Sequence, residues 1–275
     1  MPELPELETT KRALLPHLLN QTINHIEIFQ PKLRYLIDET ALRTCINKPV
    51  LALKRRAKYL LIAFSHGSLM VHLGMSGRLS IQPIKAPRLK HDHVVFTFNN
   101  KESLRYNDAR RFGFILFDEQ HFNNHSLISR LGPEPLSDDF HPLYLAQKAI
   151  NKRVGIKRFI MDNAIVVGVG NIYATESLFL AKLHPETPVD KITSSQWALL
   201  CDTIKAVLEK AIALGGTTLK DFYHVDGKPG YFAQTLNVYG RGGQACFQCQ
   251  TPIASIKIDN RSSAFCPVCQ LLFDA

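Results

Sequence analysis

Four cysteines near the C-terminus have the spacing of a metal site. Cys246 and Cys249 form one Cys-x2-Cys pair, and after sixteen intervening residues Cys266 and Cys269 form a second. Two such pairs commonly hold zinc through four thiolates. Disulfides are the alternative, but a cytosolic protein rarely keeps them. The spacing therefore predicts one structural zinc ion per chain.

The segment between the two cysteine pairs predicts a β-hairpin. Residues 253–258 and 262–265 have the composition of short strands, and Asp259-Asn260 can form the turn between them. Arg261 then lies at the tip, where a guanidinium can reach a phosphate. In the alternative interpretation the hairpin only stabilises the fold and Arg261 is solvated.

The N-terminus carries a second kind of chemistry. Met1 precedes a small residue and is expected to be removed, which leaves the α-amino group of Pro2 free. This secondary amine titrates nearer neutrality than a lysine and can form an iminium with an aldehyde-like sugar carbon. Glu3, Glu6 and Glu8 stand close by as proton-transfer groups. Acidic residues in a first helical turn also favour the helix dipole, so these carboxylates alone establish no reaction.

The composition indicates a basic globular protein. The chain has 275 residues, is 45% hydrophobic and has a formal net charge of +9, a balance that favours a polyanionic partner. Most of the excess charge belongs to residues 1–135, with 19 Lys and Arg against 12 Asp and Glu. No apolar run approaches the ~20 residues of a membrane span, and the acidic start lacks the features of a secretion signal. We expect a cytosolic protein in which Cys45 and Cys201 are buried, reduced thiols.

The elements that position these groups change type along the chain. The start predicts a helix with Leu4, Leu7, Leu14 and Leu18 on one face. Strands are then expected over 59–64, 69–73, 94–98 and 114–117, and such spacing indicates a sandwich or barrel. After Gly132-Pro133-Glu134-Pro135 the pattern becomes helical, including 172–181 and 195–213.

Further motifs are spread along the chain. They are Pro2-Glu3-Leu4-Pro5-Glu6, His72-Leu73-Gly74-Met75-Ser76-Gly77, Asp108-Ala109-Arg110-Arg111-Phe112-Gly113, Gly168-Val169-Gly170-Asn171-Ile172-Tyr173-Ala174, Asp226-Gly227-Lys228-Pro229-Gly230, and Val238-Tyr239-Gly240-Arg241 before the zinc module. Together they resemble the bacterial formamidopyrimidine-DNA glycosylases. The resemblance runs from residue 2 to about residue 270, so coincidence does not explain it.

The resemblance implies a base-excision-repair enzyme with two activities. It would remove oxidised purines such as 8-oxoguanine and formamidopyrimidines, and then nick the strand by β- and δ-elimination. Pro2 would attack C1′ of the damaged nucleotide, while Glu3 would handle the protons of sugar opening and Glu6 would support them. Lys58 would act in β-elimination and Arg261 in δ-elimination. From its residues alone, the basic cluster around Lys58 predicts only a phosphate contact.

The resemblance also implies an architecture. We expect an α+β multidomain protein with an N-terminal β-sandwich and flanking helices over residues 1–131. A helix-two-turns-helix domain with a lesion loop would follow over 132–236, and a four-cysteine zinc β-hairpin finger over 237–275. Damaged double-stranded DNA is the expected partner and one structural zinc the cofactor. We expect no membrane partner, no nucleotide cofactor and a monomer.

Other residues are expected to meet DNA or the lesion. The family's positions correspond to His72, Met75, His91, Arg110, Phe112, Lys152, Lys157 and Asn171. Met75 on a Gly-flanked turn, with Arg110 and Phe112 two residues apart on an extended segment, can fill the hole that an extruded base leaves. Asn171 opens a helix whose first amides can receive a phosphate. Without the resemblance, Met75 and Phe112 fit a core and the basic residues a solvated surface.

Two alternative functions stay open at this point. An endonuclease VIII-type enzyme shares the fold and prefers oxidised pyrimidines, although Leu4 and the segment from Gly215 to Tyr231 resemble the purine branch. A non-catalytic zinc-finger protein would bind DNA or RNA and use Pro2 only to start a helix. Borohydride trapping of a covalent complex on abasic DNA separates enzyme from binding protein.

Overall fold

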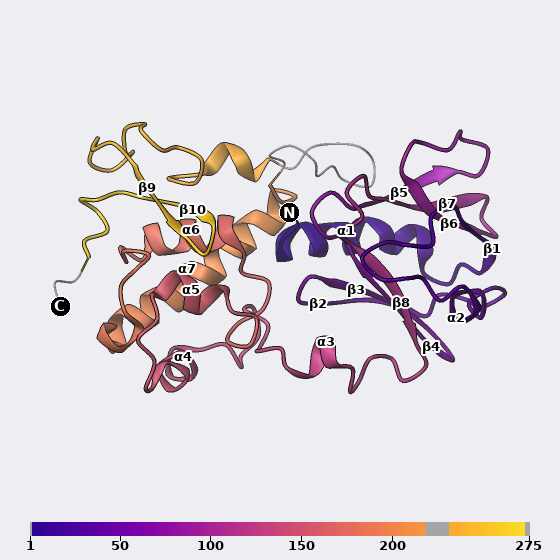
Figure 1. Ribbon diagram of the computed structural model, residues 1–275, viewed down its shortest axis with the longest axis horizontal. Helices are drawn as coiled ribbons and strands as arrows, with labels where there is room; N and C mark the ends of the chain where they lie inside the picture. The colour runs from indigo at the N-terminus through magenta and orange to yellow at the C-terminus, as the bar shows by residue number, and fades with distance from the viewer. Residues whose placement is uncertain (1, 218–230, 273–275) are drawn as a thin grey trace. The chain divides into compact units, whose positions relative to one another are not determined.

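The computed structural model describes residues 2–217 and 231–272. The chain divides into two units, Met1–Ser129 with Leu214–Ala233, and Arg130–Ala213 with Gln234–Ala275 (Figure 1). The predicted motif at 226–230 and most of the expected lesion loop lie outside the described residues.

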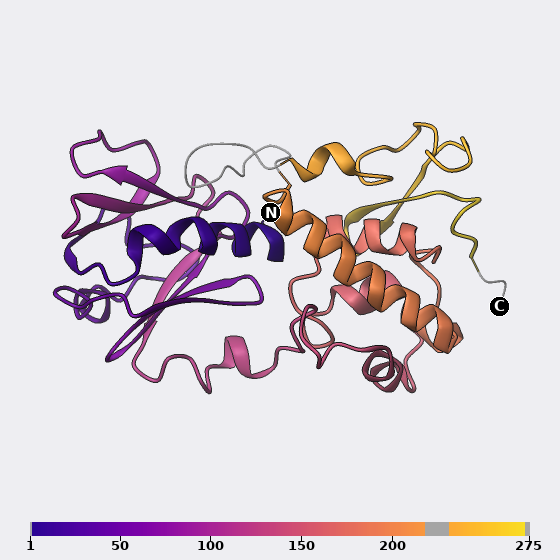
Figure 2. The same cartoon turned by 180° about the vertical axis from the view of Figure 1, so that it is seen from behind.

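Helix α1 (Leu4–Leu18) opens the first unit. Its four predicted face residues are at most 1% exposed, namely Leu4, Leu7, Leu14 and Leu18. The backbone N–H of Glu3 donates to Glu6 Oε2 at 2.7 Å, which satisfies an amide that no helical carbonyl can reach. The helix packs against strands β2 (Ala52–Arg56), β3 (Tyr59–Phe64) and β5 (Arg78–Pro83), beside which it is drawn in Figure 2.

Within the described part of the first unit, two antiparallel four-stranded sheets lie face to face. One has the order β1-β6-β7-β5 and the other β2-β3-β4-β8. The remaining bounds are β1 (Ile23–Ile28), β4 (Gly67–His72), β6 (Asp92–Phe98), β7 (Glu102–Asn107) and β8 (Phe114–Asp118), with short helices α2 (Glu39–Arg43) and α3 (Ser126–Ser129). The four strands expected from the sequence are β3, β4, β6 and β8. Because the strands form two separate sheets, the fold is the sandwich and not the barrel.

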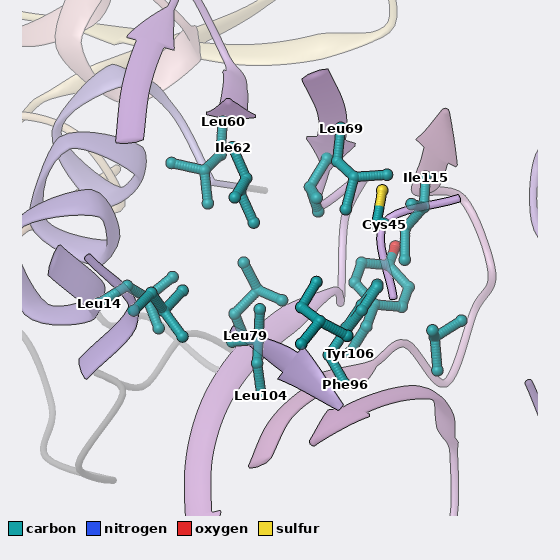
Figure 3. Close-up of a cluster of buried hydrophobic side chains, with 14 of the residues drawn as sticks. Leu14, Cys45, Leu60, Ile62, Leu69, Leu79, Phe96, Leu104, Tyr106 and Ile115 are labelled. Carbon is teal, nitrogen blue, oxygen red and sulfur yellow. The ribbon is translucent and has the colours of Figure 1, made fainter. Parts of the chain in front are cut away.

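The two sheets bury one apolar core between them (Figure 3). Leu60, Ile62 and Leu69 come from one sheet, and Phe96 and Leu104 from the other. Alternate residues of β3 are buried because successive side chains of a strand point to opposite faces. Cys45 belongs to this core, and burial raises the pKa of its thiol to about 12. Both lone thiols, Cys45 and Cys201, are free and buried, as predicted.

The second unit is helical. Its elements are α4 (Pro142–Ala149), α5 (Ile156–Met161), α6 (Asn171–Leu180), η1 (Val189–Lys191) and α7 (Ser194–Ala213), with η2 (Phe232–Thr235) at the boundary. Helix α6 is buried along almost its whole length, and it packs against α5 and α7 (Figure 2). Among the described residues, no helix combines the length and the apolar character needed to cross a membrane.

A hairpin of β9 (Ala254–Ile258) and β10 (Arg261–Phe265) packs on α6. Asp259 and Asn260 both have positive φ, 45° and 62°. Two such residues form the turn whose twist matches a two-stranded hairpin, and Asn and Asp tolerate that conformation best after glycine. The predicted hairpin and its turn are confirmed.

Candidate active site and nucleic-acid interface

The N-terminal residues are buried and tied down through Glu6. Pro2 is buried, and Glu3 and Glu6 are each 2% exposed. One Glu6 carboxylate oxygen accepts from the Glu3 amide at 2.7 Å, and the other accepts from the Thr217 amide at 2.8 Å. Gly216 has φ +80°, and a Cβ there would lie 2.9 Å from Glu6 Oε1. Glu6 therefore joins the start of the chain to the segment around residue 217.

Lys58 lies half-buried on the turn between β2 and β3. The preceding residue, Ala57, has φ +52°, a conformation that alanine rarely adopts. Arg55 supports this turn, since its Nη1 donates to the Ala57 carbonyl at 3.2 Å. Its Nε donates to Glu8 on α1 at 3.0 Å. A chain of contacts thus runs from the helix that begins beside Pro2 to the turn that carries Lys58.

His72 ends β4 with a neutral ring. It stacks on Phe114 with centroids 5.1 Å apart and an angle of 22° between the planes. Burial, together with the positive charges of Arg34 and Lys58, lowers the pKa of His72 to about 4. Its Nδ1 accepts from the Gly74 amide at 3.2 Å, so the proton of the neutral ring is on Nε2. Nε2 is therefore the ring atom that can donate to an external acceptor.

Met75, Arg110 and Phe112 occupy two neighbouring loops. Met75 is 38% and Phe112 47% exposed, although both are apolar. The guanidinium of Arg110 lies 4.9 Å from the centre of the Phe112 ring. The expectation of an extended segment from Arg110 to Phe112 is wrong, because Arg111 between them has φ +56° and the chain turns there. The turn brings the Arg110 guanidinium and the Phe112 ring into contact. An extended segment would only have placed the two side chains on the same side of the chain.

His91 lies half-buried just before β6, with φ +75°. Its carbonyl accepts from the Asp108 amide at 3.2 Å, so its loop is joined to the loop of Arg110 and Phe112. The positive charge of Lys58 helps to lower the pKa of His72, so Lys58 belongs to the same neighbourhood. His72 in turn accepts from the amide of Gly74, which lies in the Met75 loop. The structure thus brings His72, the loops of Met75 and Phe112, and His91 together where β4 ends and where β6 and β8 begin, with the Lys58 turn close to His72.

In the second unit, a cavity of about 540 Å³ gathers the four remaining predicted contact residues, Lys152, Lys157, Asn171 and Arg261. Arg158 and Asp259 also line it and lie 3.3 Å apart. Asn171 is the first residue of α6, so the free amides of the helix start lie beside these cations. Such a combination binds phosphate.

Lys157 differs from its neighbours because it is only 1% exposed. Its Nζ donates to Asn171 Oδ1 and to Ser263 Oγ, both at 2.7 Å. Asn171 Nδ2 in turn donates to the Ser262 carbonyl at 3.1 Å. Lys157 therefore joins α5, α6 and the hairpin, and it orients the side chain of Asn171.

The four cysteines fit a zinc ion. Their sulfur atoms all lie within 4.8 Å of one another, with Cys249 and Cys266 3.4 Å apart and Cys246 and Cys269 4.0 Å apart. Zn–S bonds of about 2.3 Å in a tetrahedron place sulfur atoms roughly 3.8 Å from each other. The donor set is thus that of one structural zinc, which would hold both ends of the hairpin.

Several residues that connect the site were not among the predicted site residues. Asp108 is fully buried and joins the two loops of Met75 and Phe112 through Ser76, while Arg55 joins Glu8 to the Lys58 turn. Glu176 on α6 accepts from the backbone amides of residues 237–239. Glu176 could be suspected because it is a carboxylate in a largely apolar helical stretch, whereas Asp108 lies among polar residues; the partners of both depend on the fold.

Comparison with known protein families and proteins gives a single answer. Residues 1–115 match the formamidopyrimidine-DNA glycosylase N-terminal domain, and residues 131–223 match the formamidopyrimidine-DNA glycosylase H2TH domain. A formamidopyrimidine-DNA glycosylase of Alcanivorax borkumensis is 51% identical over 272 residues, which cover 98% of this chain and 100% of the relative.

Solved structures agree with that result. Lactococcus lactis Fpg in complex with DNA that contains an abasic site is 34% identical, with a TM-score of 0.91 over 98% of this chain and 99% of that one. MutM in complex with DNA that contains carbocyclic 8-oxo-G is also 34% identical, with a TM-score of 0.90 over 98% of this chain and 100% of that one.

Proposed function

Because this chain belongs to the formamidopyrimidine-DNA glycosylase family, we propose that Pro2 is its nucleophile and Glu3 its proton-transfer group. The enzyme is a bifunctional DNA glycosylase and AP lyase that removes oxidised purines such as 8-oxoguanine and formamidopyrimidines. Its partner is damaged DNA. The bacterial origin of its relatives supports action in the bacterial cytosol.

The first stage is base removal. The secondary amine of Pro2 attacks C1′, the bond from C1′ to the base breaks, and the base leaves with a proton. The sugar ring then opens as the bond from C1′ to the ring oxygen breaks. Glu3 delivers a proton to that oxygen, and an iminium joins Pro2 to the opened sugar.

The second stage is strand cleavage. Loss of a proton from C2′ expels the 3′ phosphate, and a further elimination expels the 5′ phosphate. We assign the first elimination to Lys58 and the second to Arg261, each acting at the departing phosphate. Water then hydrolyses the iminium and frees Pro2.

The residues that would hold the DNA fall into two groups. Lys152, Asn171 and Arg261 would bind phosphate in the cavity of the second unit, with Lys157 orienting Asn171. His72 and His91 would bind the backbone near the lesion. Met75, Arg110 and Phe112 would fill the space of the extruded nucleotide, and the exposure of the apolar side chains of Met75 and Phe112 supports this role. Bound zinc would hold the hairpin that carries Arg261.

One observation carries the assignment of Pro2 and Glu3. Glu6 uses both carboxylate oxygens to hold backbone amides, one of them the amide of Glu3. That arrangement fixes the backbone from which the Pro2 nitrogen and the Glu3 carboxylate extend, as a reaction between an amine and a sugar carbon requires.

Borohydride trapping on DNA with an abasic site tests the assignment. Protein with a processed N-terminus should give a covalent complex, whereas protein that retains Met1 should give none and should lose base excision. Glu3→Gln should bind lesion DNA but excise slowly, because the change removes proton transfer and little volume. Efficient turnover by protein that retains Met1 would place the nucleophile elsewhere.

A further inference from the structure

The loops of Met75 and Phe112 meet at one buried carboxylate. Asp108 is 0% exposed, and its Oδ1 accepts from Ser76 Oγ at 2.6 Å. Its Oδ2 accepts from the Gly113 amide at 2.9 Å. Ser76 follows Met75, and Gly113 follows Phe112. One carboxylate therefore bonds to both loops.

Ser76 adds a second link between the same loops. While its hydroxyl donates to Asp108, its oxygen accepts from the Arg110 amide at 3.1 Å. The backbone of Arg110 is thus fixed to the residue next to Met75. The serine hydroxyl thus donates its proton to Asp108 and accepts the Arg110 amide through a lone pair.

The backbone of Asp108 extends this network to a third loop. Its carbonyl lies 2.7 Å from Nε2 of the buried His93, and its amide donates to the carbonyl of His91 at 3.2 Å. The loops that carry His91, Met75 and Phe112 are all connected through this one residue.

The loops of Met75 and Phe112 pack backbone against backbone. A Cβ on Gly74 would lie 2.4 Å from the Gly113 nitrogen, and a Cβ on Gly113 would lie 2.3 Å from the His72 carbonyl oxygen. Backbone contacts of this kind cannot be relieved by a side-chain rotation. The two loops are therefore joined by direct backbone packing as well as by the hydrogen bonds of Asp108 and Ser76.

We infer that Asp108 and Ser76 form a positioning centre that presents Met75, Arg110 and Phe112 to DNA as one rigid unit. The inference rests on the proposed role of these three residues in filling the space of the extruded nucleotide. Base extrusion costs a few kcal/mol of stacking and pairing. Side chains that are already fixed before binding add no ordering cost to the cost of extrusion. Side chains on mobile loops would also have to lose conformational freedom when DNA binds.

Ser76→Ala is the sharpest test, because it removes only a hydroxyl on a half-buried residue. Single-turnover excision from an intact 8-oxoguanine pair should slow about three- to tenfold, the rate equivalent of one ordinary hydrogen bond. Cleavage at a preformed abasic site should change by less than about twofold, since less extrusion work remains there. The matched control is Ser68→Ala at the other end of β4, where a buried hydroxyl lies 2.8 Å from His121 Nδ1.

A double-mutant cycle separates positioning from a general loss of structure. If Ser76 acts through Phe112, then Ser76→Ala should have little further effect on excision in a Phe112→Ala background. Asp108→Asn should cost more than Ser76→Ala, because its amide group faces donors on at least one side. The melting temperatures of the Ser76→Ala and Asp108→Asn variants are compared with that of Ser68→Ala, to show how much of each effect is a general loss of stability.

Each outcome bears on a separate claim. If Phe112→Ala slows both substrates equally, the proposed role of Phe112 is wrong. If Phe112→Ala is selective but Ser76→Ala resembles Ser68→Ala, or if the effect of Ser76→Ala persists in full in the double variant, the positioning centre is overturned while the proposed function stands.

Discussion

The Nε atom of Arg55 donates to a carboxylate oxygen of Glu8 at 3.0 Å. Burial would raise the pKa of Glu8, but hydrogen bonds from Lys11, Arg55 and Arg12 outweigh it and lower the pKa to about 2. Glu8 is therefore ionised at any pH at which the enzyme works. Since Arg55 also donates to the carbonyl next to Lys58, this pair connects the helix beside Pro2 with the proposed β-elimination residue.

Glu8→Gln should slow strand cleavage at abasic sites more than formation of the trapped complex. The variant weakens the hold on Arg55 and so on the Lys58 turn, while Pro2 keeps its own supports. We expect a reduction of about tenfold in β-elimination, as for loss of one charged hydrogen bond. Single-turnover assays of trapping and nicking measure the two steps.

Glu39→Gln is the control for this variant, because Glu39 forms an exposed ion pair with Arg43 at 3.7 Å. Exposed pairs contribute little, so nicking should be unchanged. Equal losses of trapping and nicking in Glu8→Gln would contradict the link to Lys58.

Acid should destabilise the protein partly through His72. Its pKa of about 4 in the folded state lies below the ordinary value of 6.5, so the unfolded chain takes up the proton first. The neutral ring therefore costs no stability above pH 6.5, and stability is lost as the pH falls from 6.5 towards 4, by at most about 3 kcal/mol.

Urea unfolding of wild type and His72→Gln across that range isolates this contribution. The free energy of unfolding of the variant should fall less steeply between pH 6.5 and pH 4, whereas the other titrating groups affect both proteins alike. Parallel curves would show that His72 is not held neutral by the fold.

Zinc removal should weaken DNA binding more than it unfolds the sandwich. In the hairpin, Ser263 accepts a hydrogen bond from Lys157, and the Ser262 carbonyl accepts one from Asn171. Loss of the metal should therefore release Arg261 and disturb the phosphate cavity. Purified protein should carry one zinc per chain. Cys249→Ser should lose zinc and affinity, with Cys201→Ser as the thiol control; absence of zinc from wild type would refute the site.

The sequence predicted those features that depend on residues close together along the chain. Leucine spacing gave the buried face of α1, and Asp259-Asn260 gave the hairpin turn. The link from Ser76 to Asp108 could not be predicted in this way, because its two residues are 32 positions apart and meet only when their loops pack. The turn at Arg111 was not predicted, because an arginine at φ +56° is rare; its amide donates to the Asp108 carbonyl at 3.2 Å. Lys157 was expected among DNA contacts or on a solvated surface, and its almost complete burial follows from the packing around α5.

Arg261→Ala should reduce DNA affinity together with its salt dependence. If the guanidinium neutralises one phosphate, the slope of log affinity against log salt should fall by about 0.9. Arg43→Ala, which removes an exposed arginine from α2, is the control. An unchanged slope in Arg261→Ala would exclude the phosphate contact.

Phe112→Ala and Met75→Ala should slow excision from an intact lesion pair much more than cleavage at a preformed abasic site. An enzyme that attacks C1′ must bring the nucleotide out of the duplex, and something must occupy the space left behind. The ring of Phe112 is apolar and 47% exposed, which suits a wedge between base pairs. Arg110 lies beside it and can donate to the widowed base.

Phe29→Ala is a close control, because that ring is 44% exposed and has the Arg88 guanidinium 4.2 Å from its centre. Fluorescence of 2-aminopurine next to the lesion should show weaker unstacking with Phe112→Ala and Met75→Ala, but not with Phe29→Ala. Since exposed side chains add little to folding, melting temperatures should hardly change. Equal losses on both substrates at unchanged stability would mean that these side chains do not drive extrusion.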